Sequence, residues 1–146
     1  MRSVVLGGLW LLASTAASAG IVYDDVFFKD HYSRIVRERP VFANGTPLLS
    51  MEMSKSPNGF ATATIAQTDP VKIPYNEETA HIEVTGDDID PLYIEVKNFR
   101  GVSVSWATDR ILIIKRDIGH VAAMEEVIDI VERRWLSRKA LFYKPE

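Results

Sequence analysis

The side chains in this sequence best suited to ligate a metal or carry a proton are three histidines, His31, His81 and His120. His81 and Glu83 are two residues apart, so on an extended strand they share one face. A catalytic zinc needs three protein ligands, and the third would have to come from a distant loop. The helical H-E-x-x-H pattern is absent. The sequence therefore predicts no metal and no cofactor.

Acidic residues gather at Asp87-Asp88-Ile89-Asp90, directly before Pro91. The spacing of an EF-hand calcium loop is absent, and turn chemistry accounts for the same residues. The mature chain holds neither G-x-S-x-G nor S-x-x-K, and it has no cysteine nucleophile. These absences favour a protein without catalytic activity.

Charge is distributed unevenly along the chain. The stretch from Glu77 to Glu95 contains acidic residues but no Lys or Arg. The stretch from Arg133 to Lys144 contains basic residues but no acidic ones. The bases form a candidate binding face for an anionic partner, with a merely solvated surface as the alternative. Long charged groups are seldom buried unpaired, so we expect Arg138 and Lys139 to be exposed. The candidate binding residues are Arg133, Arg134, Arg138 and Lys139.

The first segment has the three parts of a secretory signal peptide. Arg2 precedes an apolar run from Val4 to Ala13, and Ala17-Ser18-Ala19 has the A-x-A form of a cleavage site. The apolar run is shorter than the roughly 20 residues of a spanning helix. We therefore predict cleavage of residues 1–19, a single small domain over residues 20–146, and no stable membrane span after cleavage.

Composition agrees with export to a periplasm or extracellular space. The chain has 146 residues, no cysteine and a formal net charge of −3. A cysteine-free exported domain is more typical of a bacterial periplasm than of disulfide-rich extracellular proteins. The sequence pI of about 5.6 argues against a general nucleic-acid binder.

Apolar side chains recur at every second residue in several segments of residues 60–116, and this alternation predicts β-strands. Apolar side chains alternate with polar ones at Thr62–Gln67, His81–Thr85, Leu92–Lys97 and Val102–Trp106, and a short apolar run follows at Ile111–Ile114. Short links join these segments, and short links join antiparallel neighbours. The pattern predicts an antiparallel meander of about five strands. The preceding stretch, Val41–Asn58, reads as irregular.

Two flanking segments complete the predicted α+β, β-rich fold. Apolar residues spaced three to four apart predict an N-terminal helix over residues 25–38, ended by Pro40. The C-terminal segment 120–143 has both a helical apolar stripe and a β-branched run, Val127–Val131. We keep both interpretations, a helix and a further β-hairpin, with the helix slightly favoured by propensity.

The expected function is that of a small, exported, bacterial periplasmic binding or accessory domain rather than an enzyme. Its partner would be a protein or an anionic envelope component. Two alternatives stay open: a secreted hydrolase whose site is assembled from scattered histidines and carboxylates, and a structural envelope subunit. The sequence does not specify the oligomeric state.

Overall fold

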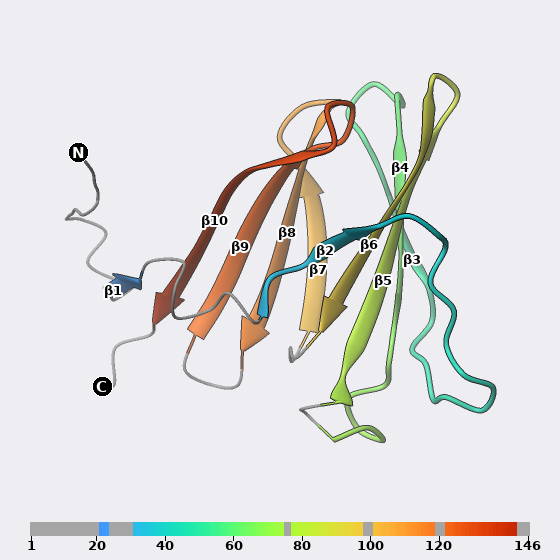
Figure 1. Cartoon of the computed structure of the whole chain (residues 1–146), viewed down its shortest axis with the longest axis vertical. Coiled ribbons are helices and arrows are strands. Elements are labelled where there is room, and N and C mark those ends of the chain that lie inside the picture. The colour runs from blue at the N-terminus through green and yellow to red at the C-terminus, as the bar shows by residue number, and fades with distance from the viewer. Residues whose placement is uncertain (1–20, 24–30, 75–76, 98–100, 119–121, 143–146) are drawn as a thin grey trace.

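The computed structural model describes residues 21–23, 31–74, 77–97, 101–118 and 122–142. In this part of the chain ten strands form two five-stranded antiparallel sheets (Figure 1). The first sheet, sheet A, has the strand order β1(Ile21–Tyr23), β10(Arg134–Phe142), β9(Ala122–Asp129), β8(Ile111–Ile118), β7(Gly101–Trp106). The second, sheet B, has the order β2(Arg34–Val36), β6(Ile89–Lys97), β5(Thr79–Gly86), β4(Thr62–Gln67), β3(Glu52–Lys55).

The predicted alternation of side chains is confirmed in β4, β5 and β6. On each strand, buried residues alternate with partly exposed ones. Ile65, Ile82 and Ile94 are directly paired neighbours across these three strands, and each is almost fully buried. One face of sheet B is therefore apolar and the other is polar, as a half-buried antiparallel sheet requires.

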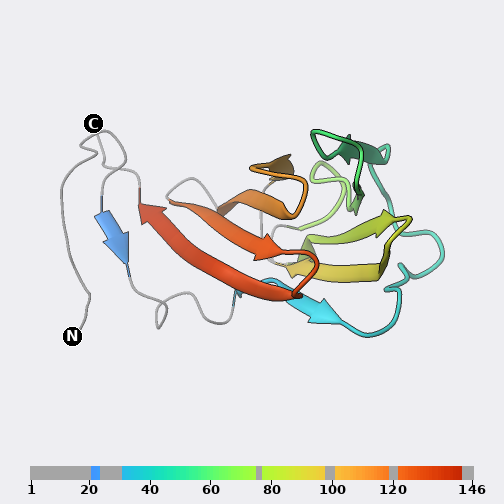
Figure 2. The same ribbon diagram turned by 90° about the horizontal axis from the view of Figure 1, so that it is seen from above.

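The apolar faces of the two sheets pack against each other. One cluster of buried side chains joins Ile82 and Leu92 of sheet B to Leu112, Ile114 and Ile128 of sheet A. The fold is thus a two-layer β-sandwich. Seen from above, β3 and β7 lie toward one side of the sandwich, and β2 and β10 toward the other (Figure 2).

The β5–β6 turn requires glycine. Gly86 lies at a register shift, where it pairs with Ile89. A Cβ atom added to Gly86 would lie 2.5 Å from the carbonyl oxygen of Phe60, closer than real Cβ contacts. The acidic residues Asp87 and Asp88 form the turn itself, as turn chemistry predicts.

The predicted meander needs one correction. Its strands form, but β6 and β7 belong to different sheets although the link between them is short. The chain passes from one layer of the sandwich to the other at this point. A short link therefore did not mean that its two strands are paired neighbours.

The predicted N-terminal helix over residues 25–38 is wrong where the structure describes it. Residues 34–36 form β2, which pairs with β6 at Arg34↔Glu95 and Val36↔Tyr93. Residues 25–30 of that prediction lie outside the described residues. The segment that reads as irregular also contains a strand, β3. The described residues contain no α-helix, so the α+β label is wrong and the β-rich part of the prediction is confirmed.

The C-terminal segment is the hairpin β9–β10, and its helical interpretation is wrong. The carboxylate of Asp129 accepts the backbone N–H groups of Val131 and Glu132, both at 2.9 Å. Arg133 then adopts a left-handed backbone, with φ of 58°. These interactions close a tight turn that a continuous helix excludes. Across the described residues, no helix is long and apolar enough to cross a membrane.

Candidate functional site

The four predicted basic binding residues do not form one face. Arg138 points into the sandwich, with only 19% of its side chain exposed, whereas the neighbouring Lys139 points outward and is 50% exposed. Arg134 is exposed and lies 3.8 Å from Glu132. Arg133 donates to the carbonyl oxygens of Asp90 and Pro91 at 2.6 and 3.1 Å. The prediction that Arg138 is exposed is therefore wrong, and Arg133 contacts the backbone of the acidic stretch.

A β-bulge at Leu136 explains the position of Arg138. Trp135 pairs with Ile128, but Ser137 pairs with Val127, so Leu136 is an extra residue on β10. A regular strand would turn Trp135 and Arg138 to opposite faces, because they are three residues apart. The bulge places both on the inner face of sheet A.

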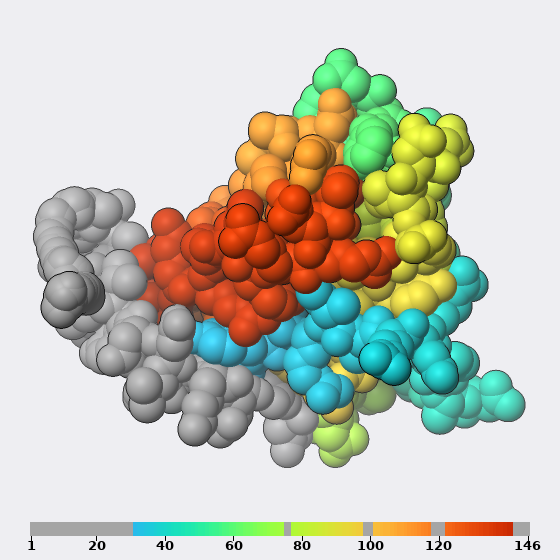
Figure 3. All heavy atoms as spheres, turned by 45° about the horizontal axis from the view of Figure 1, so that its top comes forward, coloured from blue at the N-terminus to red at the C-terminus, as the bar shows by residue number. Residues whose placement is uncertain are grey.

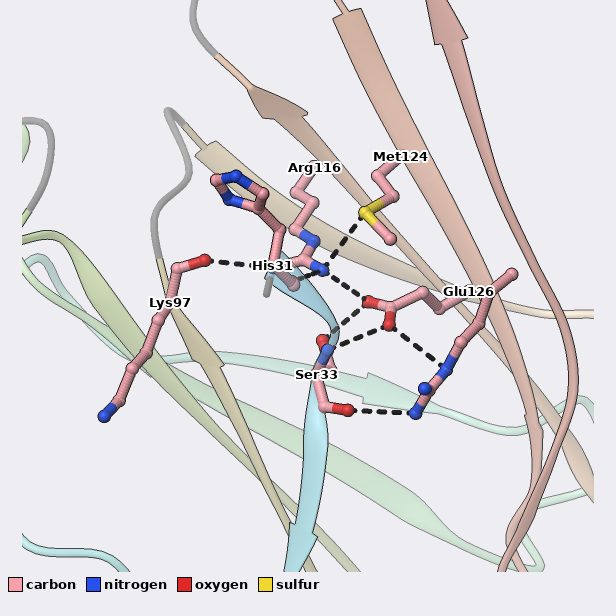
Figure 4. A network of polar contacts seen from close by, with 7 residues as sticks. His31, Ser33, Lys97, Arg116, Met124 and Glu126 are labelled. Carbon is pink, nitrogen blue, oxygen red and sulfur yellow. Dashed lines mark hydrogen bonds and ion pairs between the residues drawn. The ribbon is translucent and has the colours of Figure 1, made fainter. Parts of the chain in front are cut away.

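Glu126 is the centre of a buried polar network (Figure 4), and Arg138 belongs to it through its contact with that carboxylate. Glu126 is fully buried, and its carboxylate lies 3.1 Å from Arg116 Nη2 and 3.6 Å from Arg138 Nε. Ser33 donates twice to the same carboxylate, through its backbone N–H at 2.9 Å and its hydroxyl at 2.6 Å. Carboxylate oxygens accept several donors, so this one buried carboxylate can contact two guanidinium groups and Ser33 at once.

The same network holds residues 31–33 against sheet A. Arg116 donates to the carbonyl oxygens of Lys97 and His31, and Arg138 donates to that of Ser33 at 3.0 Å. The Arg138 guanidinium also lies over the rings of Tyr32 and Trp135, at 4.4 and 4.2 Å from their centroids. In Figure 3 the blue segment that begins at residue 31 borders the red β9–β10 hairpin.

This network is suited to structure rather than to catalysis. The Ser33 hydroxyl contacts a carboxylate, which is a pairing that could activate a nucleophile. Ser33 is only 1% exposed, however, and Glu126 is not exposed at all, so a substrate has no access to either. The network joins β2 of sheet B, through the residues that precede it, to β8, β9 and β10 of sheet A.

His81 and Glu83 share the outer face of sheet B, as predicted, but they do not form a metal site. The His81 ring stacks on Phe42, with centroids 4.0 Å apart, and Glu83 accepts from Arg39 at 2.6 Å. Burial lowers the pKa of His81 below its usual value. The described residues hold no group of three or more acidic or histidine side chains that could bind a metal ion.

The acidic side chains of this outer face are paired with arginines. Arg34 lies 2.6 Å from Glu95, and the hydrogen bond it donates lowers the pKa of that carboxyl group. Arg39 makes the matching ion pair with Glu83, also at 2.6 Å. Arg34 comes from the segment 25–38 that the sequence assigns to a helix, and Arg39 directly follows that segment. Part of the acidic stretch is therefore neutralised within the molecule.

An open hollow of about 510 Å³ lies on the outer face of sheet A. Small residues, Gly101 and Ala123, lower its floor, and Leu141 forms part of its wall. Two of its lining side chains, Lys115 and Glu125, lie 3.8 Å apart, and Lys139 of β10 lies 3.6 Å from Glu125. Groups that are paired across the surface in this way do not converge on a ligand, so the hollow lacks the polar arrangement typical of a small-molecule site.

The most distinctive surface is an exposed apolar edge beside β3. Leu48 and Leu49 run alongside the end of β4 through the bridge Leu48↔Thr68 and a hydrogen bond from Leu49 N to the carbonyl oxygen of Gln67. Met51 and Met53 follow, 64% and 68% exposed. We call these four residues the apolar edge. They occur in the stretch that reads as irregular, and only its scattered methionines could have drawn attention to it.

A comparison with protein-family models, curated proteins and solved structures finds no match for this chain. The surface of the molecule itself must therefore support any functional conclusion.

Proposed function

We propose that this protein is an exported, non-enzymatic binding domain that docks a protein partner on its apolar edge. Export is inferred from the leader-like residues 1–19, and binding from the surface of sheet B. The carrying observation is the concentration of large, exposed apolar side chains within Leu48–Met53. Clustered apolar side chains on a surface are typical of interaction sites.

The composition of the apolar edge suits a protein partner. Methionine side chains are flexible and polarizable, and they adapt to irregular apolar surfaces. The edge strand also presents backbone groups that an incoming strand can pair with. In the described part of sheet B, no strand pairs with β3 on the side away from β4.

The charges of β3 and β10 argue against an anionic ligand as the main partner. The charged residues of β3 are one acid, Glu52, and one base, Lys55. The basic residues of β10 are divided between the inner and outer faces, and Arg138 and Lys139 are each engaged with an acid. An anionic envelope component would find a paired surface there.

The test is capture of envelope proteins by the full mature domain and by a double variant, Met51→Lys with Met53→Lys. Both side chains are exposed, so the variant should keep its fold, with a stability change within about 0.5 kcal/mol per site. A matched control, Val131→Lys with Leu136→Lys, alters two exposed apolar residues of the β9–β10 hairpin. We expect the edge variant to lose its partner and the control to retain it. Equal capture by both variants would contradict the proposal.

A further inference from the structure

The backbone of β3 has an open hydrogen-bonding side. The N–H of Ser56 donates to the carbonyl oxygen of Ala61 at 2.9 Å, and the pairing Ser54↔Ala63 continues the same register. In an antiparallel pair, alternate residues direct their N–H and C=O groups toward the partner strand. Ser54 and Ser56 therefore face β4. The N–H and C=O groups of Met53 and Lys55 then point to the other side.

The side chains of β3 also alternate. Ser54 pairs with the buried Ala63, so the Ser54 side chain lies on the face of sheet B that packs against sheet A. The backbone carbonyl oxygen of Ser54 also accepts the Trp106 indole N–H at 3.3 Å. Met53 pairs with Thr64 on the outer face of the sheet. An added strand would therefore meet an outer row that includes Met53 and Lys55, with the exposed Met51 directly before β3.

We propose that the apolar edge pairs antiparallel with the same edge of a second copy of this chain, about a two-fold axis at Met53. This inference rests on the proposed function and names the partner. In that register Met53 lies opposite Met53 of the second copy, and Met51 lies opposite Lys55. The methionine side chain can then lie along the methylene stem of the lysine.

Charge selects this register over its neighbours. With the axis at Met53, Glu52 lies opposite Ser54, so no like charges are directly opposed. A shift of the axis to Glu52 would place two carboxylates against each other, which is destabilising. A shift to Ser54 would leave Met51 opposite Pro57, beyond the end of β3. The register centred on Glu52 would also pair Met51 with Met53, so the opposed carboxylates are what disfavour it.

Local neutrality permits two negatively charged chains to meet here. The chain carries a formal net charge of −3, which opposes self-association at long range. Glu52 and Lys55 cancel each other within β3. The edge is thus a neutral, apolar strip on an acidic molecule, and it is suited to a partner with the same composition.

Disulfide crosslinking tests this pairing. Because the chain has no cysteine, a single introduced cysteine can form a disulfide only with a second copy of the chain. Directly opposed residues of a hydrogen-bonded antiparallel pair have Cα atoms about 5.5 Å apart, which lies within the range of a disulfide. A Met53→Cys variant of the mature protein should form a disulfide-linked dimer under a mild oxidant at least about tenfold faster than a Val131→Cys control. Equal rates for the two variants would overturn the two-fold pairing.

Sedimentation of the cysteine-free protein provides a second readout. We expect a monomer–dimer equilibrium for the wild type and a monomer for Met53→Lys at the same concentrations. A wild-type protein that stays monomeric throughout would overturn the inference. If the Met51→Lys, Met53→Lys variant still loses an envelope partner in that case, the proposed function stands and the partner is a different protein.

Discussion

Arg138 of β10 and Glu126 of β9 lie directly opposite each other on the inner face of sheet A, with Arg138 Nε 3.6 Å from Glu126 Oε2. The pair is buried beside a second guanidinium, that of Arg116, which is 3.1 Å from the same carboxylate. Removing Glu126 would leave both guanidinium groups without their shared counter-charge in a low-dielectric interior. The network should therefore control the stability of the sandwich near residues 31–33.

Glu126→Gln should destabilise the fold strongly. The substitution keeps the shape of the side chain but leaves Arg116 and Arg138 without a buried counter-charge, and breaking a buried pair costs on the order of 3–5 kcal/mol. Urea unfolding measures the loss. Glu125→Gln is the matched control, because Glu125 is the neighbouring residue on the outer face and its ion pairs are exposed. A loss no larger for Glu126→Gln than for the control would contradict the structural role of the network.

Charge reversal at two adjacent residues should have opposite outcomes. Arg138→Glu places a carboxylate against Glu126 and removes the cation that lies over Tyr32 and Trp135, so the domain should fail to fold or should unfold at a much lower temperature. Lys139→Glu changes an exposed side chain and should leave the thermal midpoint within a few degrees of wild type. Thermal unfolding followed by circular dichroism distinguishes the two. Similar midpoints for both variants would show that Arg138 does not point inward.

Stability should fall in mild acid through His81. Burial lowers the pKa of His81 in the folded state, so the folded protein favours the neutral ring. The stability of the folded protein is therefore highest, as far as His81 is concerned, above the pKa of this residue in the unfolded chain, about 6.5. This contribution to stability is lost as the pH falls through that value toward the folded pKa. His81→Phe keeps a ring against Phe42 and removes the titration, so it should flatten the stability profile between about pH 7.5 and 5.5 relative to wild type. Parallel profiles for the two proteins would contradict this assignment.

Export can be tested on the protein recovered from its native compartment. The tripartite N-terminus predicts that the mature chain begins at Gly20. Intact-mass spectrometry should show the loss of residues 1–19. Recovery of the uncleaved chain from the cytoplasm would contradict the leader and, with it, the exported role.

The strands that alternate strictly could be predicted from sequence, whereas the C-terminal hairpin could not be told from a helix. In β4, β5 and β6 every buried position except Gln67 is apolar, so the period of two is visible. In β8 and β9 the inner row contains Arg116 and Glu126. In β9 the buried charge interrupts the apolar pattern, and propensity then slightly favours a helical stripe over residues 120–143. The mutual pairing of Arg116 and Glu126 depends on contacts distant in sequence, which local propensity does not record.

The candidate site was hidden for a related reason. The basic residues of β10 look like one patch in sequence, but the bulge at Leu136 and the alternation of the strand divide them between two faces. The apolar edge has neither a motif nor a regular period. Met51 and Met53 stand out only once β3 is known to be the last strand of sheet B and their side chains are known to be exposed.

Site-specific photocrosslinking in the cells that export the protein tests the central claim most directly. A photoreactive phenylalanine analogue at Met53 reports on the apolar edge, and the same residue at Lys139 reports on the basic stretch of β10. The account predicts a discrete crosslinked species from Met53, whether its partner is a second copy or another protein, and none above background from Lys139. Crosslinking from Lys139 alone would contradict the account and return the binding surface to the basic face.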